Sequence, residues 1–269
     1  MQQFLLLREP AGIGSLRASR SPGEIMNSGF YAACAGLQAQ TQALELMANN
    51  VANVNTTGYR GQLPMFRSVL TEAGPELSNP LNRVINDFGV LGGSRTDLSA
   101  GNLESTGNTL DLAIEGNGFF AVQGKAGTLY TRNGNFQVST KAQLITTSGD
   151  LVLGELGPIT MPNGAVSISP DGTISVEGAV AGKLRLVDFV PGTLLNAEGK
   201  AYYSAPDAAA RPAADSQVRQ GMLESSNVDA VRAVVDLISV QRQAEMLERA
   251  LSLYQSNFNH IAANDLPKV

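Results

Sequence analysis

Residues 30–60 read FYAACAGLQAQTQALELMANNVANVNTTGYR and contain the most regular pattern in this chain. Apolar residues recur at alternating spacings of three and four, as in the seam of a coiled coil. The seam positions are Phe30, Ala33, Leu37, Gln40, Leu44, Met47, Val51 and Val54. Only Gln40 among them is polar. The spacing therefore predicts a long helix that packs along a partner helix through one face.

An asparagine-rich segment follows this helix. Asn tolerates the left-handed backbone conformation, and its side chain bonds nearby backbone groups. The residues expected to end the helix and redirect the chain are Asn49, Asn50, Asn53, Asn55 and Gly58. We expect this turn to set the angle between the helix and the part of the chain that follows it.

The same spacing recurs at the other end of the chain. All ten positions are apolar or aromatic: Ala230, Ala233, Leu237, Val240, Ala244, Leu247, Leu251, Tyr254, Phe258 and Ile261. No Pro or Gly interrupts residues 228–264, so a second long helix is predicted. A further apolar stripe lies beside its seam and consists of Val231, Val234, Val235 and Ile238. This stripe indicates that the helix has additional neighbours.

Two interpretations of these seams stay open. Either the two terminal helices pair within one molecule, or the seams also pack against other copies. The residues that would carry packing between copies are Leu37, Leu44, Met47, Val51, Leu237, Val240, Leu247, Leu251, Tyr254 and Phe258. Small seam residues allow close approach of helices, and Gln40 would fix the register at some cost in stability.

Between residues 96 and 204 the apolar pattern changes to alternation, and glycine-containing turns recur every eight to twelve residues. This pattern predicts short β-strands. Three hairpins are expected, centred on residues 116–118, 133–134 and 170–173. No GxxxxGK[ST] motif is present, so the glycines indicate turns rather than a phosphate site. The fold class is thus α+β, with a coiled-coil-like pair of terminal helices and a central all-β domain of short strands and Gly turns.

The remaining segments complete the expected organisation. Residues 1–25 are interpreted as a disordered tail or a mis-called start, because the regular pattern begins at Met26. The expected order is then an N-terminal assembly helix with its turn (26–60), a connector (61–95), the β domain (96–204), a Pro- and Ala-rich linker (205–220) and a C-terminal assembly helix (221–269).

Composition argues against catalysis. The chain has one histidine, His260, and one cysteine, Cys34, which disfavours a Cys/His zinc site or a catalytic triad. The carboxylates are scattered, and no pair has a spacing suited to general acid and base work. The net charge is −5, from 19 basic and 24 acidic residues, and gives no electrostatic reason to expect binding of nucleic acid. No apolar run reaches the length of a membrane span. We expect no enzyme activity, no cofactor and no metal.

Four segments resemble the bacterial flagellar basal-body rod and hook protein family. The first is GLQAQTQALELMANNVANVNTTGYR at residues 36–60, which is similar to the family's helix and Asn-rich turn. LDLAIEGNGFF at 110–120 and YTRNGNF at 130–136 resemble two central segments. GMLESSNV at 221–228 resembles the C-terminal signature. The four segments occur in family order and extend over most of the chain from Met26.

This resemblance implies a structural subunit of the flagellar rod, needed for flagellum assembly and motility. The terminal helices would pack into the inner tube of the rod, and the β domain would face outward. The implied partners are other copies of the chain, other rod proteins and the flagellar type III export apparatus, without nucleic acid or membrane insertion. The implied location is the basal body, reached without a cleaved signal peptide. The short body and residues 245–250 favour a proximal over a distal rod subunit.

Two alternatives from other classes stay open. The first is a periplasmic binding or adhesive module that binds a ligand through the β domain. A deep pocket lined by convergent polar residues in that domain would favour it. A hydrolase would need a nucleophile, and no residue in the sequence is a candidate for one.

Overall fold

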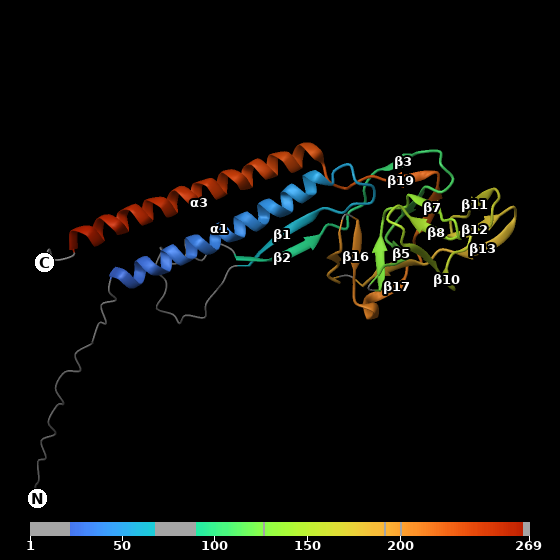
Figure 1. Ribbon diagram of the computed structural model, residues 1–269, viewed down its shortest axis with the longest axis horizontal. Coiled ribbons are helices and arrows are strands. Elements are labelled where there is room, and N and C mark those ends of the chain that lie inside the picture. The colour runs from blue at the N-terminus through green and yellow to red at the C-terminus, as the bar shows by residue number, and fades with distance from the viewer. Residues whose placement is uncertain (1–21, 68–89, 126, 191, 200, 266–269) are drawn as a thin grey trace, which may run out of the picture.

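Two long helices lie side by side at one end of an elongated molecule, and a β domain forms the other end (Figure 1). The computed structural model describes residues 22–67, 90–125, 127–190, 192–199 and 201–265. Helix α1 (Pro22–Ala52) and helix α3 (Ala230–Asp265) pack against each other. The expected α+β class, with paired terminal helices around a central β domain, is therefore confirmed. None of the described helices has an apolar stretch that would span a membrane.

Helix α1 begins at Pro22, so the last four residues of the segment expected to be a tail belong to the helix. Residues 1–21 lie outside the described residues. Proline suits the first turn of a helix, because its missing N–H would have no partner there anyway. The regular apolar pattern thus starts one turn after the helix itself.

A β-hairpin covers a second face of α1. Strands β1 (Gln62–Arg67) and β2 (Val90–Thr96) pair antiparallel, and both contact α1. Ala39 and Ala43 of α1 are almost fully buried, and their small side chains allow close packing. The hairpin occupies both ends of the connector expected at 61–95, whose residues 68–89 lie outside the described residues.

The β domain is built from short antiparallel strands. The chain first forms β3 (Leu103–Ser105), β4 (Leu112–Glu115), β5 (Phe119–Gln123), β6 (Thr128–Thr131), β7 (Phe136–Val138), β8 (Leu144–Thr146), β9 (Leu151–Gly154) and β10 (Gly157–Pro158). It continues with β11 (Val166–Ile168), β12 (Thr173–Val176), β13 (Ala179–Lys183), β14 (Leu186–Phe189), β15 (Asn196–Ala197) and β16 (Tyr202–Ser204). The largest sheet has the order β15-β16-β6-β5-β9-β8-β7, and β11, β12 and β13 form a smaller one.

Only one of the three expected hairpins is confirmed. Strands β11 and β12 pair across the turn at 170–173, with Ile168 opposite Ile174. The turns at 116–118 and 133–134 do not join paired strands, because β4 pairs with β18, β6 pairs with β5 and β16, and β7 pairs with β8. Turn residues indicate where the chain changes direction, whereas the choice of partner depends on side-chain packing.

The linker expected at 205–220 is wrong, because this segment belongs to the β domain. It contains η1 (Asp207–Ala209), β17 (Ala210–Pro212) and β18 (Gln217–Gln220), and β19 (Met222–Glu224) follows. Pro212 is tolerated because β17 pairs with β14 alone and so lies at an edge. Strands β18 and β19 pair with β4 and β3 and lead the chain back to α3, which begins at residue 230 rather than 221.

Two hydrophobic clusters fill the β domain. The larger one consists of Leu112, Ile114, Phe120, Val122, Phe136, Leu144, Val152, Ile159, Met161, Ile168, Ile174, Leu184 and Val218. The smaller one consists of Phe119, Ala121, Tyr130, Val187, Phe189, Leu195 and Tyr203. Successive residues of β5 point into different clusters, so this strand separates and supports both.

Replacing Phe120 with Ala tests this core. Phe120 is fully buried and meets the ring of Phe136 edge to face, with ring centroids 5.1 Å apart. We expect Phe120→Ala to lower the free energy of unfolding by about 3–5 kcal/mol, because it leaves a cavity. Val180→Ala, at an exposed site, should change it by less than about 0.5 kcal/mol. Chemical denaturation followed by circular dichroism measures both, and similar values would contradict the core assignment.

Candidate functional site

The turn after α1 connects the helix to the hairpin through asparagine side chains. The Asn50 amide donates to the carbonyl oxygen of Gln62 at 2.8 Å, and its Oδ1 accepts from the Gln62 N–H at 2.9 Å. Asn50 Oδ1 also accepts from the Tyr59 hydroxyl at 3.0 Å. The Asn53 amide donates to the carbonyl oxygen of Asn49 at 2.9 Å. Asn50 therefore pairs with β1 much as a neighbouring strand would, while Asn53 closes the end of the helix.

Gly58 is the point where this turn meets the β domain. Its N–H donates to the carbonyl oxygen of Glu224 at 2.7 Å, and its φ of 67° lies in the left-handed region. A Cβ at this position would lie 2.3 Å from the backbone nitrogen of Asn133. Both conformation and space therefore require glycine here. The fifth predicted turn residue, Asn55, is exposed and does not join these contacts.

A buried ion network lies directly beside Gly58. Arg60 Nη2 lies 2.7 Å from Glu224 Oε1, and Arg132 Nη1 lies 3.0 Å from Glu224 Oε2. All three side chains are at most 3% exposed. One carboxylate thus joins the turn after α1, the centre of the β domain and the strand that leads to α3. In the monomer these three parts are held at one point.

Backbone groups supply further hydrogen bonds to this network. Gly101 N–H donates to Glu224 Oε1 at 2.8 Å, and Arg60 Nη1 donates to the carbonyl oxygen of Ser99. Arg132 donates to the carbonyl oxygens of Ile114 and Gly116 at 3.0 and 2.6 Å. These bonds attach the charged groups to fixed backbone, which favours a single arrangement of the junction.

Aromatic side chains enclose the same charges. The Arg132 guanidinium lies 5.3 Å from the ring centroid of Phe119, a distance that allows a cation–π interaction. The Tyr203 hydroxyl accepts from the Arg60 N–H at 2.8 Å. Burial lowers the pKa of Arg132 to about 10, against the opposing effect of the Glu224 charge. Burial likewise raises the pKa of Tyr203. Both groups keep their usual protonation at neutral pH.

Asn227 forms a second connection just before α3. Its Oδ1 accepts from the Gly61 N–H at 2.8 Å, and its amide donates to the carbonyl oxygens of Asp97 and Ser99, each at 3.0 Å. Asp229 then caps the helix, because its Oδ1 accepts from the Arg232 N–H at 2.7 Å. The start of α3 is thus bound to the beginning of β1 and to the segment that follows β2.

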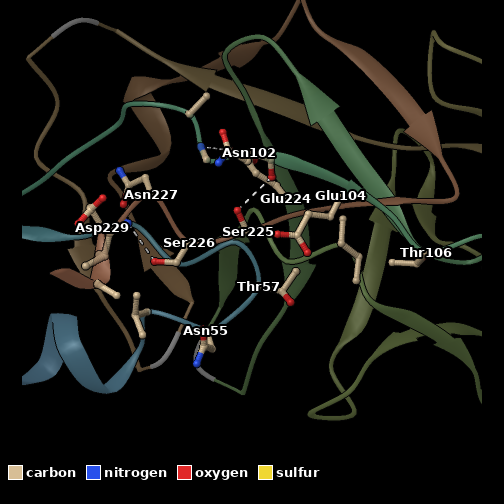
Figure 2. Close-up of a pocket in the computed structure, with 16 residues that line it drawn as sticks. Asn55, Thr57, Asn102, Glu104, Thr106, Glu224, Ser225, Ser226, Asn227 and Asp229 are labelled. Atoms are coloured by element: carbon tan, nitrogen blue, oxygen red, sulfur yellow. Dashed lines mark hydrogen bonds between the residues drawn. The ribbon is translucent and has the colours of Figure 1, made fainter. Parts of the chain in front are cut away.

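An open groove of about 660 Å³ lies over this junction. Figure 2 shows that the turn after α1 supplies Asn55 and Thr57, while the segment before α3 supplies Ser225 and Ser226. The walls are largely polar, and the Glu224 carboxylate in the groove is already bonded to the two arginines. Among the described residues, no group of three or more His, Cys, Asp or Glu side chains is placed to hold a metal.

The predicted seam residues lie on covered faces of the two helices. Met47 and Leu251 are buried, and those that are half-buried are Leu37, Leu44, Val51, Leu237, Val240 and Leu247. The side chains of Tyr254 and Phe258 lie outside the described residues. Because α1 is the element that packs along α3, the covered face of α3 is the one toward α1. The stripe beside it, which includes Val231 and Val235, is exposed.

Three charged residues of the family-like segments, Arg60, Arg132 and Glu224, had no predicted role. A signal was nevertheless present, because each is a charged residue within a segment otherwise rich in Gly, Asn and apolar residues. Such segments are candidates for buried ion pairs, since a buried charge needs a partner of opposite sign. The hairpin on α1 was missed as well, although the small residues Ala39 and Ala43, which are buried in the structure, lie outside the predicted seam.

Replacing Glu224 with Gln tests the ion network. The variant leaves two buried guanidinium groups without a counter-charge, so we expect the free energy of unfolding to fall by about 3–5 kcal/mol. Glu115→Gln is the matched control, because Glu115 pairs with Arg219 at 2.7 Å on the exposed surface and should contribute at most about 1 kcal/mol. Equal losses in urea denaturation would show that Glu224 does not hold the junction.

Three family models match the chain in order. The flagella basal body rod protein model matches residues 30–60, the flagellar hook protein FlgE/F/G D1 domain model matches 113–176, and the flagellar basal body rod FlgEFG protein C-terminal model matches 219–263. Arg60, Arg132 and Glu224 come from the first, second and third of these segments. The segments that define the family thus meet in the buried ion network.

Curated relatives match along most of the chain. The flagellar basal-body rod protein FlgF of Caulobacter vibrioides is 33% identical, over 84% of this chain and 93% of the relative. FlgG of Agrobacterium fabrum is 34% identical, over 82% and 92%, and FlgF of Escherichia coli is 32% identical, over 86% and 96%. With these matches and the fold described above, the chain belongs to the flagellar basal-body rod and hook protein family.

Proposed function

We propose that this chain is a structural subunit of the flagellar basal-body rod. The observation that carries the proposal is the ion network at the junction, because it joins one residue from each family segment into a fixed support for the helix pair. A rod transmits torque, so its subunits need a defined angle between the helices and the outer domain. Residues 49–58 and Glu224 would provide that angle.

The paired helices suit the axial part of such a rod. The predicted seam residues follow the spacing of a coiled coil, and the small side chains Ala33 and Ala233 are buried, which allows close approach. In the assembled rod the helices would pack into the inner tube, and the β domain would lie outside them. The role is structural, which agrees with relatives named as rod proteins.

Within the family, we infer a proximal rod subunit. The FlgF and FlgG relatives are almost equally similar, at 33% and 34% identity, so identity does not separate the two. The inference rests on the short body and on residues 245–250, EMLERA. The flagellar type III apparatus would export the chain, and its neighbours would be other copies and other rod proteins.

Crosslinking in isolated basal bodies tests this placement. A proximal subunit should crosslink to the distal rod protein on one side and to other proximal rod components on the other. Crosslinks to the hook instead would place the chain at the distal end. Absence of the chain from purified basal bodies of a motile strain that produces it would contradict the proposed function itself.

Replacing Leu247 with Asp tests the helix pair. A carboxylate at this half-buried position of α3 would be partly removed from water without a partner of opposite charge, so we expect loss of rod assembly and of swimming in soft agar. The β domain should keep its protease resistance, because its core clusters contain no residue of α3. Leu247→Met is the control and should remain motile, since it keeps an apolar side chain of similar volume. Normal motility of the Asp variant would exclude the helix pair as an assembly element.

A further inference from the structure

The face of α3 that points away from α1 carries a long uncovered stripe. It consists of Val231, Val235, Ile238, Arg242, Met246, Arg249 and Leu253, which we call the outer stripe. Its five apolar members are between 45% and 77% exposed. At 1.5 Å per residue the outer stripe spans about 33 Å. Exposed apolar side chains gathered along one helix face, here with Arg242 and Arg249 among them, mark a site of association.

The helical period places the outer stripe opposite the partner helix. Val235 follows the buried Ala233 by two residues, which is about 200° around the helix axis. Ile238 follows Ala233 by five residues and returns to the same side. The outer stripe therefore cannot be covered by α1 of its own molecule, and Figure 1 shows α3 at the edge of the structure, with α1 between it and the hairpin.

Charges on the two outer faces of the helix pair are complementary. Arg242 and Arg249 of the outer stripe make no ion pair within the described residues. The outer face of α1 is exposed and consists of Gln38, Gln42, Glu45, Ala48, Asn49 and Ala52. Its one carboxylate, Glu45, is also unpaired within that part of the chain. The outer stripe thus carries two cations, and the outer face of α1 carries one anion.

Arg242 and Glu45 also lie at similar distances from the junction, measured along the helix axes. Val54, just after α1, and Ala230, the first residue of α3, line the same groove, so both helices leave the junction at one level. Along the helix axes Glu45 lies about 14 Å from that level and Arg242 about 18 Å. The difference of about 4–5 Å is within reach of the two side chains. By the same measure, Ala48 and Ala52 lie level with Val235 and Val231.

We propose that the outer stripe of one copy docks on the outer face of α1 of a second copy that stands beside it with the same orientation. Arg242 would then pair with Glu45 of the neighbour, and the small Ala48 and Ala52 would receive the larger valines. Such a contact joins two different faces, so it is heterologous and can continue from copy to copy around an axis. The proposal rests on the proposed rod function and names the surface by which copies meet.

Disulfide trapping tests this contact in the full chain. Glu45→Cys and Arg242→Cys are introduced together on a Cys34→Ala background, since Cys34 is the single native cysteine. Position 242 lies on the side of α3 that points away from α1, so its thiol cannot reach position 45 of the same chain. Basal bodies are isolated from cells making this variant, oxidised and separated by mass without reductant. We expect species of two and more chains, while each single-site variant stays monomeric.

The other outcomes distinguish this contact from its alternatives. Dimers formed equally by a single-site variant would show contact between identical faces and overturn the proposal. Bands that contain a different rod protein would overturn the choice of a second copy. A variant chain present in basal bodies without any disulfide product would overturn the contact yet leave the rod function intact, whereas absence of the unmodified chain from basal bodies would overturn the rod function.

Discussion

A single buried carboxylate, that of Glu224, is the group on which the arrangement of this protein depends. It neutralises one of two guanidinium groups, so the network of Arg60, Arg132 and Glu224 keeps a net positive charge. Removing such groups from water costs free energy that their attraction only partly offsets. The network is therefore a poor source of stability but a strict condition on geometry, because its bonds form only when three distant segments meet in one arrangement.

This geometric requirement explains why the helix pair and the β domain have one defined arrangement. Asn50 and Asn227 satisfy backbone groups of the hairpin and of the segment behind it, and Gly58 provides the close approach. These polar bonds are directional, whereas apolar packing alone tolerates small rotations. The helix pair is consequently oriented by hydrogen bonds and ion pairs at its base, and its outward faces are exposed.

The sequence predicted what depends on local periodicity and missed what depends on distant partners. Spacings of three and four predicted both helices, and two of the predicted seam residues, Met47 and Leu251, are buried. The pairing of β18 with β4, the hairpin on α1 and the ion network join segments far apart in the chain, and local turn signals carry no information on such partners. Residues 205–220 were predicted to be a linker for the same reason. Their Pro and Ala content is typical of a linker, whereas their strands pair with β14 and β4, which lie far away in the sequence.

Electron cryomicroscopy of isolated basal bodies tests the central claim, that the helix pair and the β domain form one unit fixed at the junction and repeated along the rod. The account predicts rod density in which α1 and α3 of each copy remain paired near the axis, the β domain lies outside them, and Glu224 stays between Arg60 and Arg132. Density in which the two helices of a copy separate, or the domain adopts different angles among copies, would contradict it.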